Sequence, residues 1–90
     1  MKVKIRVFVS GAVQGVFFRS FVRSNANLLG VRGWAKNTKV GKVEALFEGE
    51  KENVDKVIEL CRKGPPGAMV EKVDTFQEKY RGDLKEFEIK

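Results

Sequence analysis

A strict alternation of residue types marks the first ten positions of the chain. In residues 2–10, one set of alternate positions is apolar and β-branched, and the other is mostly charged; the apolar set is Val3, Ile5, Val7 and Val9. Successive side chains of a strand point to opposite faces, so a period of two predicts a strand with one buried face. Residues 43–47 alternate in the same way, and the short turn at 39–42 joins them to the extended residues 31–38. These two segments predict a hairpin.

Two further segments have the spacing of amphipathic helices. Apolar residues recur at helical intervals from Phe18 to Leu29, and Gly30 follows where a left-handed C-terminal cap belongs. The second segment has a stripe with the intervals i, i+3, i+4 and i+7, formed by Val54, Val57, Ile58 and Cys61. It stops at the Gly-Pro-Pro-Gly sequence of residues 64–67, which cannot continue a helix.

The remaining apolar residues predict two more strands. Val70, Val73 and Phe76 indicate a fourth strand, and Phe87 and Ile89 indicate a short fifth strand at the C-terminus. The order is therefore β-α-β-β-α-β with a short C-terminal strand, which matches a ferredoxin-like α/β sandwich. We predict an α+β fold with two helices on one face of an antiparallel sheet, built as a single domain over residues 1–90.

Composition and charge restrict the ligands and the kinds of site that this chain can have. The formal net charge is +6, from 18 basic and 12 acidic side chains, which favours anionic ligands. The chain has one cysteine and no histidine, so it has neither a disulfide framework nor a His-based metal site or general base. The N-terminus lacks the apolar core of a signal peptide, and no run is long enough to span a bilayer. We therefore expect a cytoplasmic protein without membrane contact, and charged edge strands favour a monomer.

The strongest candidate site is the segment over residues 11–19, Gly-Ala-Val-Gln-Gly-Val-Phe-Phe-Arg. This glycine-bounded loop follows a predicted strand, opens a predicted helix and ends at Arg19. Glycines let main-chain N–H groups turn toward one point, and the start of a helix adds unpaired donors and a positive dipole end. A cation at that end of a helix is unfavourable unless an anion lies beside it. The loop thus predicts an anion-binding cradle with Arg19 as its fixed charge.

Together with the sequence Gly33-Trp34-Ala35-Lys36-Asn37, this loop strongly resembles the two signature motifs of the acylphosphatases. The resemblance implies hydrolysis of the carboxyl–phosphate bond of a small acyl phosphate, without a metal or other cofactor. It implies that Arg19 and Asn37 are the catalytic residues: Arg19 grips the phosphate and Asn37 orients the attacking water. The loop amides would also bind the phosphate, through Gln14, Gly15, Val16, Phe17 and Phe18. The chain departs from the usual family pattern at Ala12, Ala35 and Val40.

Two alternative functions remain open at this point. The first is an acylphosphatase-like module that binds carbamoyl phosphate within a larger maturation machine, because such modules resemble this chain in both motifs. The second, from a different class, is an RNA-binding ferredoxin-like domain. Such a domain needs a basic and aromatic run on a central strand, and residues 42–49 do not supply one. We therefore expect no nucleic-acid partner.

Overall fold

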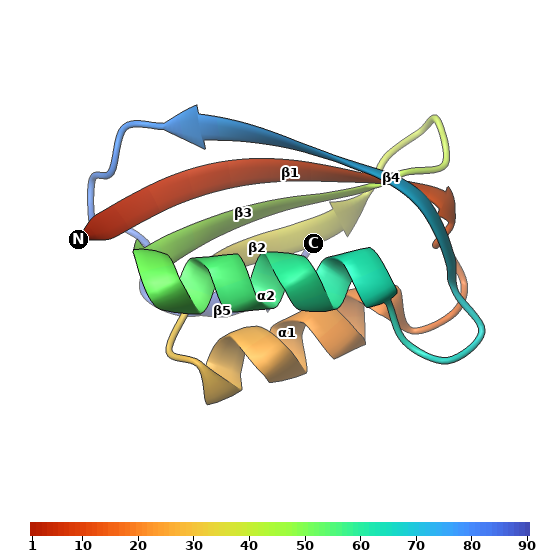
Figure 1. Ribbon diagram of the computed structural model, residues 1–90, viewed down its shortest axis with the longest axis horizontal. Coiled ribbons are helices and arrows are strands. Elements are labelled where there is room, and N and C mark those ends of the chain that lie inside the picture. Colours follow the sequence, from red (N-terminus) through yellow and green to blue (C-terminus); the bar gives the residue numbers. More distant parts are fainter.

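In the computed structural model, which describes residues 1–90, a five-stranded sheet carries both helices on one face (Figure 1). The elements follow the predicted order: β1 (Lys2–Ala12), α1 (Phe18–Leu28), β2 (Arg32–Asn37), β3 (Val43–Glu50), α2 (Lys51–Lys63), β4 (Met69–Glu78) and β5 (Phe87–Ile89). Across the sheet the strand order is β4-β1-β3-β2-β5. The predicted ferredoxin-like α+β fold is therefore confirmed.

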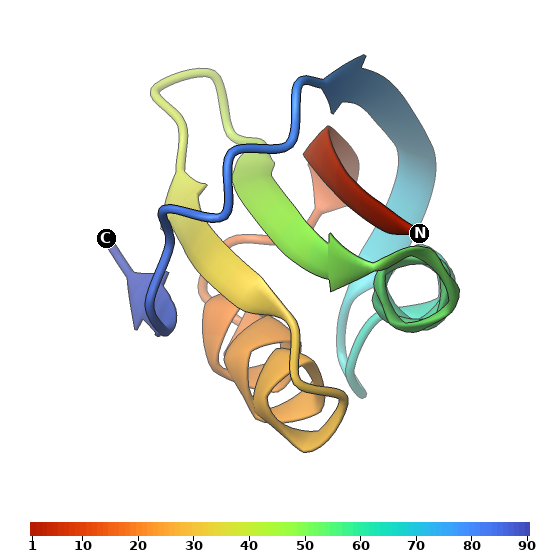
Figure 2. The same ribbon diagram turned by 90° about the vertical axis from the view of Figure 1, so that its left-hand side faces the viewer.

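The sheet is mixed, so the prediction of an antiparallel sheet holds for β1 to β4 and is wrong for β5. β5 pairs in parallel with β2, with Gly33 opposite Phe87 and Ala35 opposite Ile89. The reason is the path of the chain, because β4 lies at one edge of the sheet and β5 at the other. Residues 79–86 must cross from edge to edge, and Figure 2 shows them passing over the side of the sheet away from the helices. After that crossing, the chain enters β5 in the direction of β2.

A buried carboxylate on β3 fixes this crossing segment. Glu48 is only 2% exposed. Its carboxylate oxygens accept main-chain N–H bonds from Arg81, Gly82 and Leu84, at 3.3, 3.0 and 3.4 Å. A buried carboxylate is costly unless it is hydrogen-bonded, and here the donors come from the loop that it holds. The polar segment before β5 is thus anchored from the middle of the sheet.

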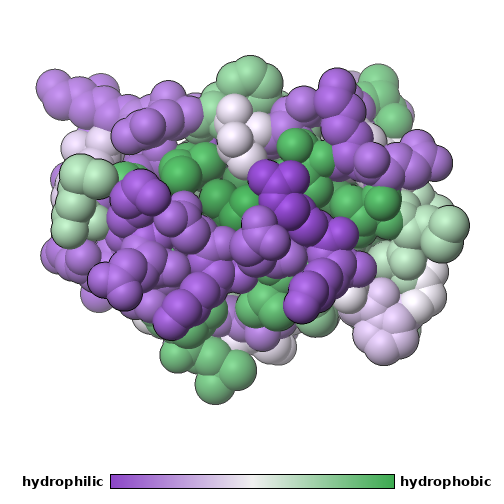
Figure 3. Space-filling model, in the orientation of Figure 1, coloured by the Kyte–Doolittle hydropathy of each residue, from purple (hydrophilic) through white to green (hydrophobic).

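The core lies between the sheet and the two helices. The alternating apolar residues of β1 and β3 face the helices, as the sequence predicted; the fully buried members of the whole cluster include Val7, Val9, Val43, Phe47, Val22, Val54 and Val57. Cys61 belongs to this core, and burial raises the pKa of its thiol to about 12, so it packs as a small apolar residue. The outward side of α2 is almost wholly hydrophilic (Figure 3). Neither helix combines the length and apolarity that crossing a membrane requires.

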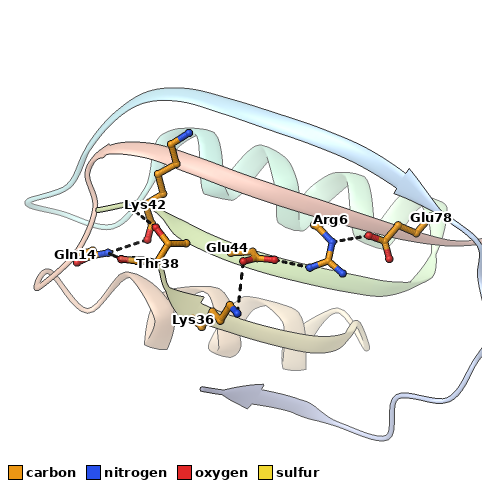
Figure 4. A network of polar contacts seen from close by, with 7 residues as sticks. All are labelled: Arg6, Gln14, Lys36, Thr38, Lys42, Glu44 and Glu78. Carbon is orange, nitrogen blue, oxygen red and sulfur yellow. Dashed lines mark hydrogen bonds and ion pairs between the residues drawn. The ribbon is translucent and has the colours of Figure 1, made fainter. Parts of the chain in front are cut away.

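The opposite, open face of the sheet is held together by ion pairs between strands. Arg6 of β1 donates to Glu78 of β4 through Nε and to Glu44 of β3 through Nη1 (Figure 4). The hydrogen bond from Arg6 lowers the pKa of the Glu78 carboxyl, and the same bond raises the pKa of Arg6. The Trp34 ring lies on this face too, with the Arg6 guanidinium carbon 5.5 Å and the Lys90 ammonium nitrogen 4.8 Å from its centroid. This face therefore ties β4, β1, β3 and β2 together laterally.

We expect Glu48→Ala to lower the free energy of unfolding by about 3 kcal/mol, because three partly buried main-chain hydrogen bonds lose their charged acceptor. Urea denaturation of the purified variant measures this loss. Glu50→Ala is the matched control, since Glu50 follows on the same strand but pairs only with the exposed N-terminal amine, at 3.3 Å. Such a surface pair contributes less than about 1 kcal/mol. Equal losses in the two variants would contradict the anchoring role of Glu48.

Candidate active site

A cavity of about 240 Å³ opens where the loop after β1, the end of β2 and strand β5 meet. Eight residues line it: Val13, Gly15, Phe17, Phe18, Arg19, Ser20, Asn37 and Ile89. Arg19 and Asn37, the two candidate catalytic residues, are thus brought together from separate segments of the chain. Gly15, Phe17 and Phe18 of the candidate binding loop line the same cavity.

Main-chain N–H groups of residues that line this cavity have no helical partner. Gly15 and Phe17 both have left-handed backbone angles, with φ values of 74° and 58°. The first N–H to close a helical bond in α1 is that of Phe21, which donates to the Phe17 carbonyl at 3.0 Å. The N–H groups of residues 18–20 therefore have no partner within the helix. The first turn of α1 contains no acidic residue, so no side-chain charge offsets the positive end of the helix dipole.

Arg19 is oriented by the C-terminal end of the chain. Its Nη1 donates to the main-chain oxygen of Lys90 at 2.9 Å. The Lys90 N–H in turn donates to the carbonyl of Ala35 on β2, also at 2.9 Å. A guanidinium carries five N–H donors, so this contact fixes the group and leaves a planar fork for an oxyanion. The oxygen of Lys90 also compensates a cation at the unfavourable end of a helix.

The Gln14 side chain joins the two sequence motifs. Its amide nitrogen donates to two main-chain carbonyls of the β2–β3 hairpin, those of Thr38 and Lys42, each at 2.9 Å (Figure 4). Gln14 does not line the cavity with its side chain, and Val16 packs against the core instead. Phosphate binding through the main-chain amides of residues 14–18, these two included, remains a prediction.

Asn37 occupies an exposed position at the end of β2, where a tight turn begins. The Thr38 N–H donates to the Lys42 carbonyl at 2.8 Å, and the Lys42 N–H donates to Thr38 Oγ1 at 3.0 Å. Gly41 has a φ of 86°, which the turn needs, and Val40 is exposed beside it. The departure from the family pattern at Val40 therefore lies at the tip of the turn, and Asn37 lies at its hydrogen-bonded base.

Three residues that line the cavity were not among the predicted site residues: Val13, Ser20 and Ile89. Val13 lies within the glycine-bounded loop and Ser20 directly follows it, so their closeness to the candidate residues can be read from the sequence. Ile89 is different, because it reaches the cavity only through the parallel pairing of β5 with β2. Nothing in the local sequence around Ile89 indicates that pairing.

An α+β sandwich that places an arginine, a free helix start and an asparagine in one small cavity is built to handle a small anion. The sequence model of the acylphosphatase family matches residues 5–89. The chain is 48% identical to an acylphosphatase of Rubrobacter xylanophilus, over 97% of this chain and 79% of the relative. It therefore belongs to the acylphosphatase family.

Solved structures agree with this membership. The structure of an acylphosphatase from Coxiella burnetii superposes with a TM-score of 0.94 at 38% identity, covering 99% of this chain and 93% of that chain. The structure of T. kodakarensis HypF contains a similar region, with a TM-score of 0.83 at 33% identity. That match covers 100% of this chain but only 12% of the HypF chain. The same fold thus occurs both in proteins of this size and as a small part of a larger one.

We expect Gln14→Leu to lower the free energy of unfolding by about 2 kcal/mol, because two partly buried hydrogen bonds are lost. The same change should move the amide NMR signals of residues 37–43, since the hairpin loses its tie to the loop. Gln77→Leu is the control, because Gln77 is an exposed glutamine on β4 and makes no contact between the loop and the hairpin. Spectral changes confined to residues 14–19 would show that Gln14 does not position the hairpin.

Proposed function

We propose that this protein hydrolyses the carboxyl–phosphate bond of acyl phosphates, releasing a carboxylate and inorganic phosphate. The observation that supports this most directly is the meeting of Arg19, Asn37 and the start of α1 in one cavity. Arg19 and the loop amides from Gln14 to Phe18 hold the phosphate, and the Asn37 amide orients the attacking water. Family membership supports the reaction class, because the relatives bear the name acylphosphatase.

The chemistry suits a site made of donors without a strong base. Phosphoryl transfer needs positioning and charge stabilisation more than covalent assistance, and an acyl phosphate has a carboxylate leaving group. Water attacks phosphorus, the bond from phosphorus to the acyl oxygen breaks, and the carboxylate departs with the bonding electrons. The chain has no histidine, so we assign the proton of the water to an oxygen of the substrate phosphate.

We further propose that residues 1–90 form one acylphosphatase-like domain that acts as a cytoplasmic monomer, without a cofactor or a nucleic-acid partner. The free edge of β4 supports the monomer, because it carries exposed charged side chains such as Glu71 and Lys72. Charges on an edge strand oppose pairing with a second sheet.

We expect Arg19→Ala to reduce kcat/KM for benzoyl phosphate at least about 100-fold, because several charge-assisted hydrogen bonds to the phosphate are lost. Arg19→Lys should not restore activity, since an ammonium lacks the planar fork that matches two phosphate oxygens. Asn37→Ala should reduce kcat by about 10²- to 10³-fold, as expected for a contact made in the transition state. Initial rates of benzoyl phosphate hydrolysis test all three variants.

Arg23→Ala is the matched control for Arg19, because Arg23 is an exposed arginine one turn further along α1 and does not line the cavity. A phosphate monoester should be a poor substrate for every form of the protein. Near-normal turnover by Arg19→Ala or Asn37→Ala would refute the assigned site. Activity on the monoester alone would refute the assigned reaction.

The second candidate is the acylphosphatase-like module that binds carbamoyl phosphate within a larger machine, because such modules resemble this chain in both motifs. The similar region within the longer T. kodakarensis HypF chain supports the part of this candidate that places the fold inside a larger protein. The same assay separates the two functions. The first predicts turnover of benzoyl phosphate and other acyl phosphates. The second predicts reaction with carbamoyl phosphate and no turnover of benzoyl phosphate.

The pH dependence of kcat/KM should show the ionisation of the substrate phosphate and remain flat through neutrality. Arg19, Ser20 and Asn37 are the polar side chains that line the cavity, so no carboxyl, thiol or imidazole side chain lies there to act as a base. Burial raises the pKa of the Cys61 thiol to about 12, so this group stays protonated as well. A pH–rate profile with benzoyl phosphate measures this. An enzyme ionisation near pH 7 would rule out proton transfer to the substrate phosphate.

A further inference from the structure

Phe17 has an unusual conformation and environment for a phenylalanine. Its side chain is 85% exposed. It occupies the N-cap position of α1 with φ 58° and ψ 30°, and no other residue except glycine has a positive φ. This region of backbone space is unfavourable for a bulky residue. Both the exposure and the backbone therefore oppose phenylalanine at this position.

Neither core packing nor helix capping accounts for the ring. The adjacent Phe18 supplies the core contact: it is 2% exposed, and its ring packs edge-on against Phe21 with centroids 6.2 Å apart. Helix N-caps are usually residues whose side chain accepts an N–H bond, and Phe17 makes no such bond. Glycine would adopt the left-handed conformation without strain. The loop geometry thus requires a left-handed residue here but does not require an aromatic one.

Phe17 lies at the cavity in which the proposed acyl phosphate would bind. Phe17 lines the same cavity as Arg19 and Asn37, together with the apolar side chains of Val13 and Ile89. With the phosphate against Arg19 and the helix start, the acyl group must extend away from these donors. An apolar acyl group that covered the exposed ring would remove its apolar surface from water, which favours binding. A small or polar acyl group would leave that surface exposed.

We propose that Phe17 is the contact for the acyl group and gives the enzyme a preference for acyl phosphates with aromatic or large apolar acyl groups. This proposal rests on the function proposed above. It assigns the ring a role separate from the main-chain amide of Phe17, which belongs to the phosphate cradle. The left-handed backbone keeps the ring outside the core and at the cavity.

The test compares benzoyl phosphate with acetyl phosphate, which differ in the size and apolarity of the acyl group. In Phe17→Ala and Phe17→Gly, kcat/KM for benzoyl phosphate should fall about 5-fold more than kcat/KM for acetyl phosphate, because the lost apolar contact affects the larger group. Phe17→Tyr keeps the ring and should keep the wild-type ratio. The glycine variant also removes the backbone strain, so a fall in its ratio cannot come from a distorted loop.

Leu28→Ala is the control, because Leu28 is 83% exposed at the other end of α1 and lies outside the cavity. It should leave both rates unchanged. An unchanged ratio in Phe17→Gly, or an equal fall for both substrates, would overturn the acyl contact while leaving the hydrolase function intact. If the wild-type protein hydrolyses neither substrate, the proposed function itself fails.

Discussion

The candidate site depends on the double hydrogen bond from the Gln14 side chain to the β2–β3 hairpin. The glycine-bounded loop of residues 11–19 and Asn37 belong to separate segments, and each could be formed locally without the other. A carboxamide nitrogen has two donors, and Gln14 uses both, one on each side of the turn that follows Asn37. The contact therefore fixes the orientation of the hairpin end relative to the loop, which a single bond would leave free to rotate. In the proposed function, phosphate binding by the loop and orientation of the water by Asn37 would therefore depend on the same two hydrogen bonds.

The C-terminal strand supplies a second constraint, and it acts through the sheet. Glu48 holds the crossing segment on the open face, and that segment leads into β5 beside β2. β5 places Ile89 in the cavity and the Lys90 oxygen against Arg19. The buried Glu48 carboxylate, on the open face of the sheet, thus helps to orient the Arg19 guanidinium at the start of α1. Neither side chain touches the other, yet both are fixed by the path of the same terminal segment.

The local parts of this arrangement could be predicted from the sequence, and the long-range parts could not. The alternation in β1 and the stripe in α2 identify elements because they reflect burial of one face. The glycine loop ending in Arg19 predicts an anion site from local features alone, namely the glycines, the helix start and the arginine. The parallel pairing of β5 was missed, since it joins residues about fifty positions apart and depends on how the crossing segment folds. The partner of the Gln14 side chain was missed for the same reason, because a glutamine in a loop carries no sign of what it will contact.

The two helices differ in how well their end residues match the sequence preferences of helix ends, and the mismatches gather at the candidate site. α2 follows the rules: Glu52 lies in its first turn, and Arg62 and Lys63 lie in its last turn, each complementing the helix dipole. α1 breaks them within a few residues, with a phenylalanine in a left-handed conformation and an arginine at the positive end of the helix. Each of these features disfavours the folded state by itself, and all of them line one cavity. Sequences that otherwise agree with their fold keep such conflicts where function requires them. An anion bound at this helix start would meet the unpaired amides and balance Arg19, so the features that cost the free protein stability are the ones that a phosphate would use.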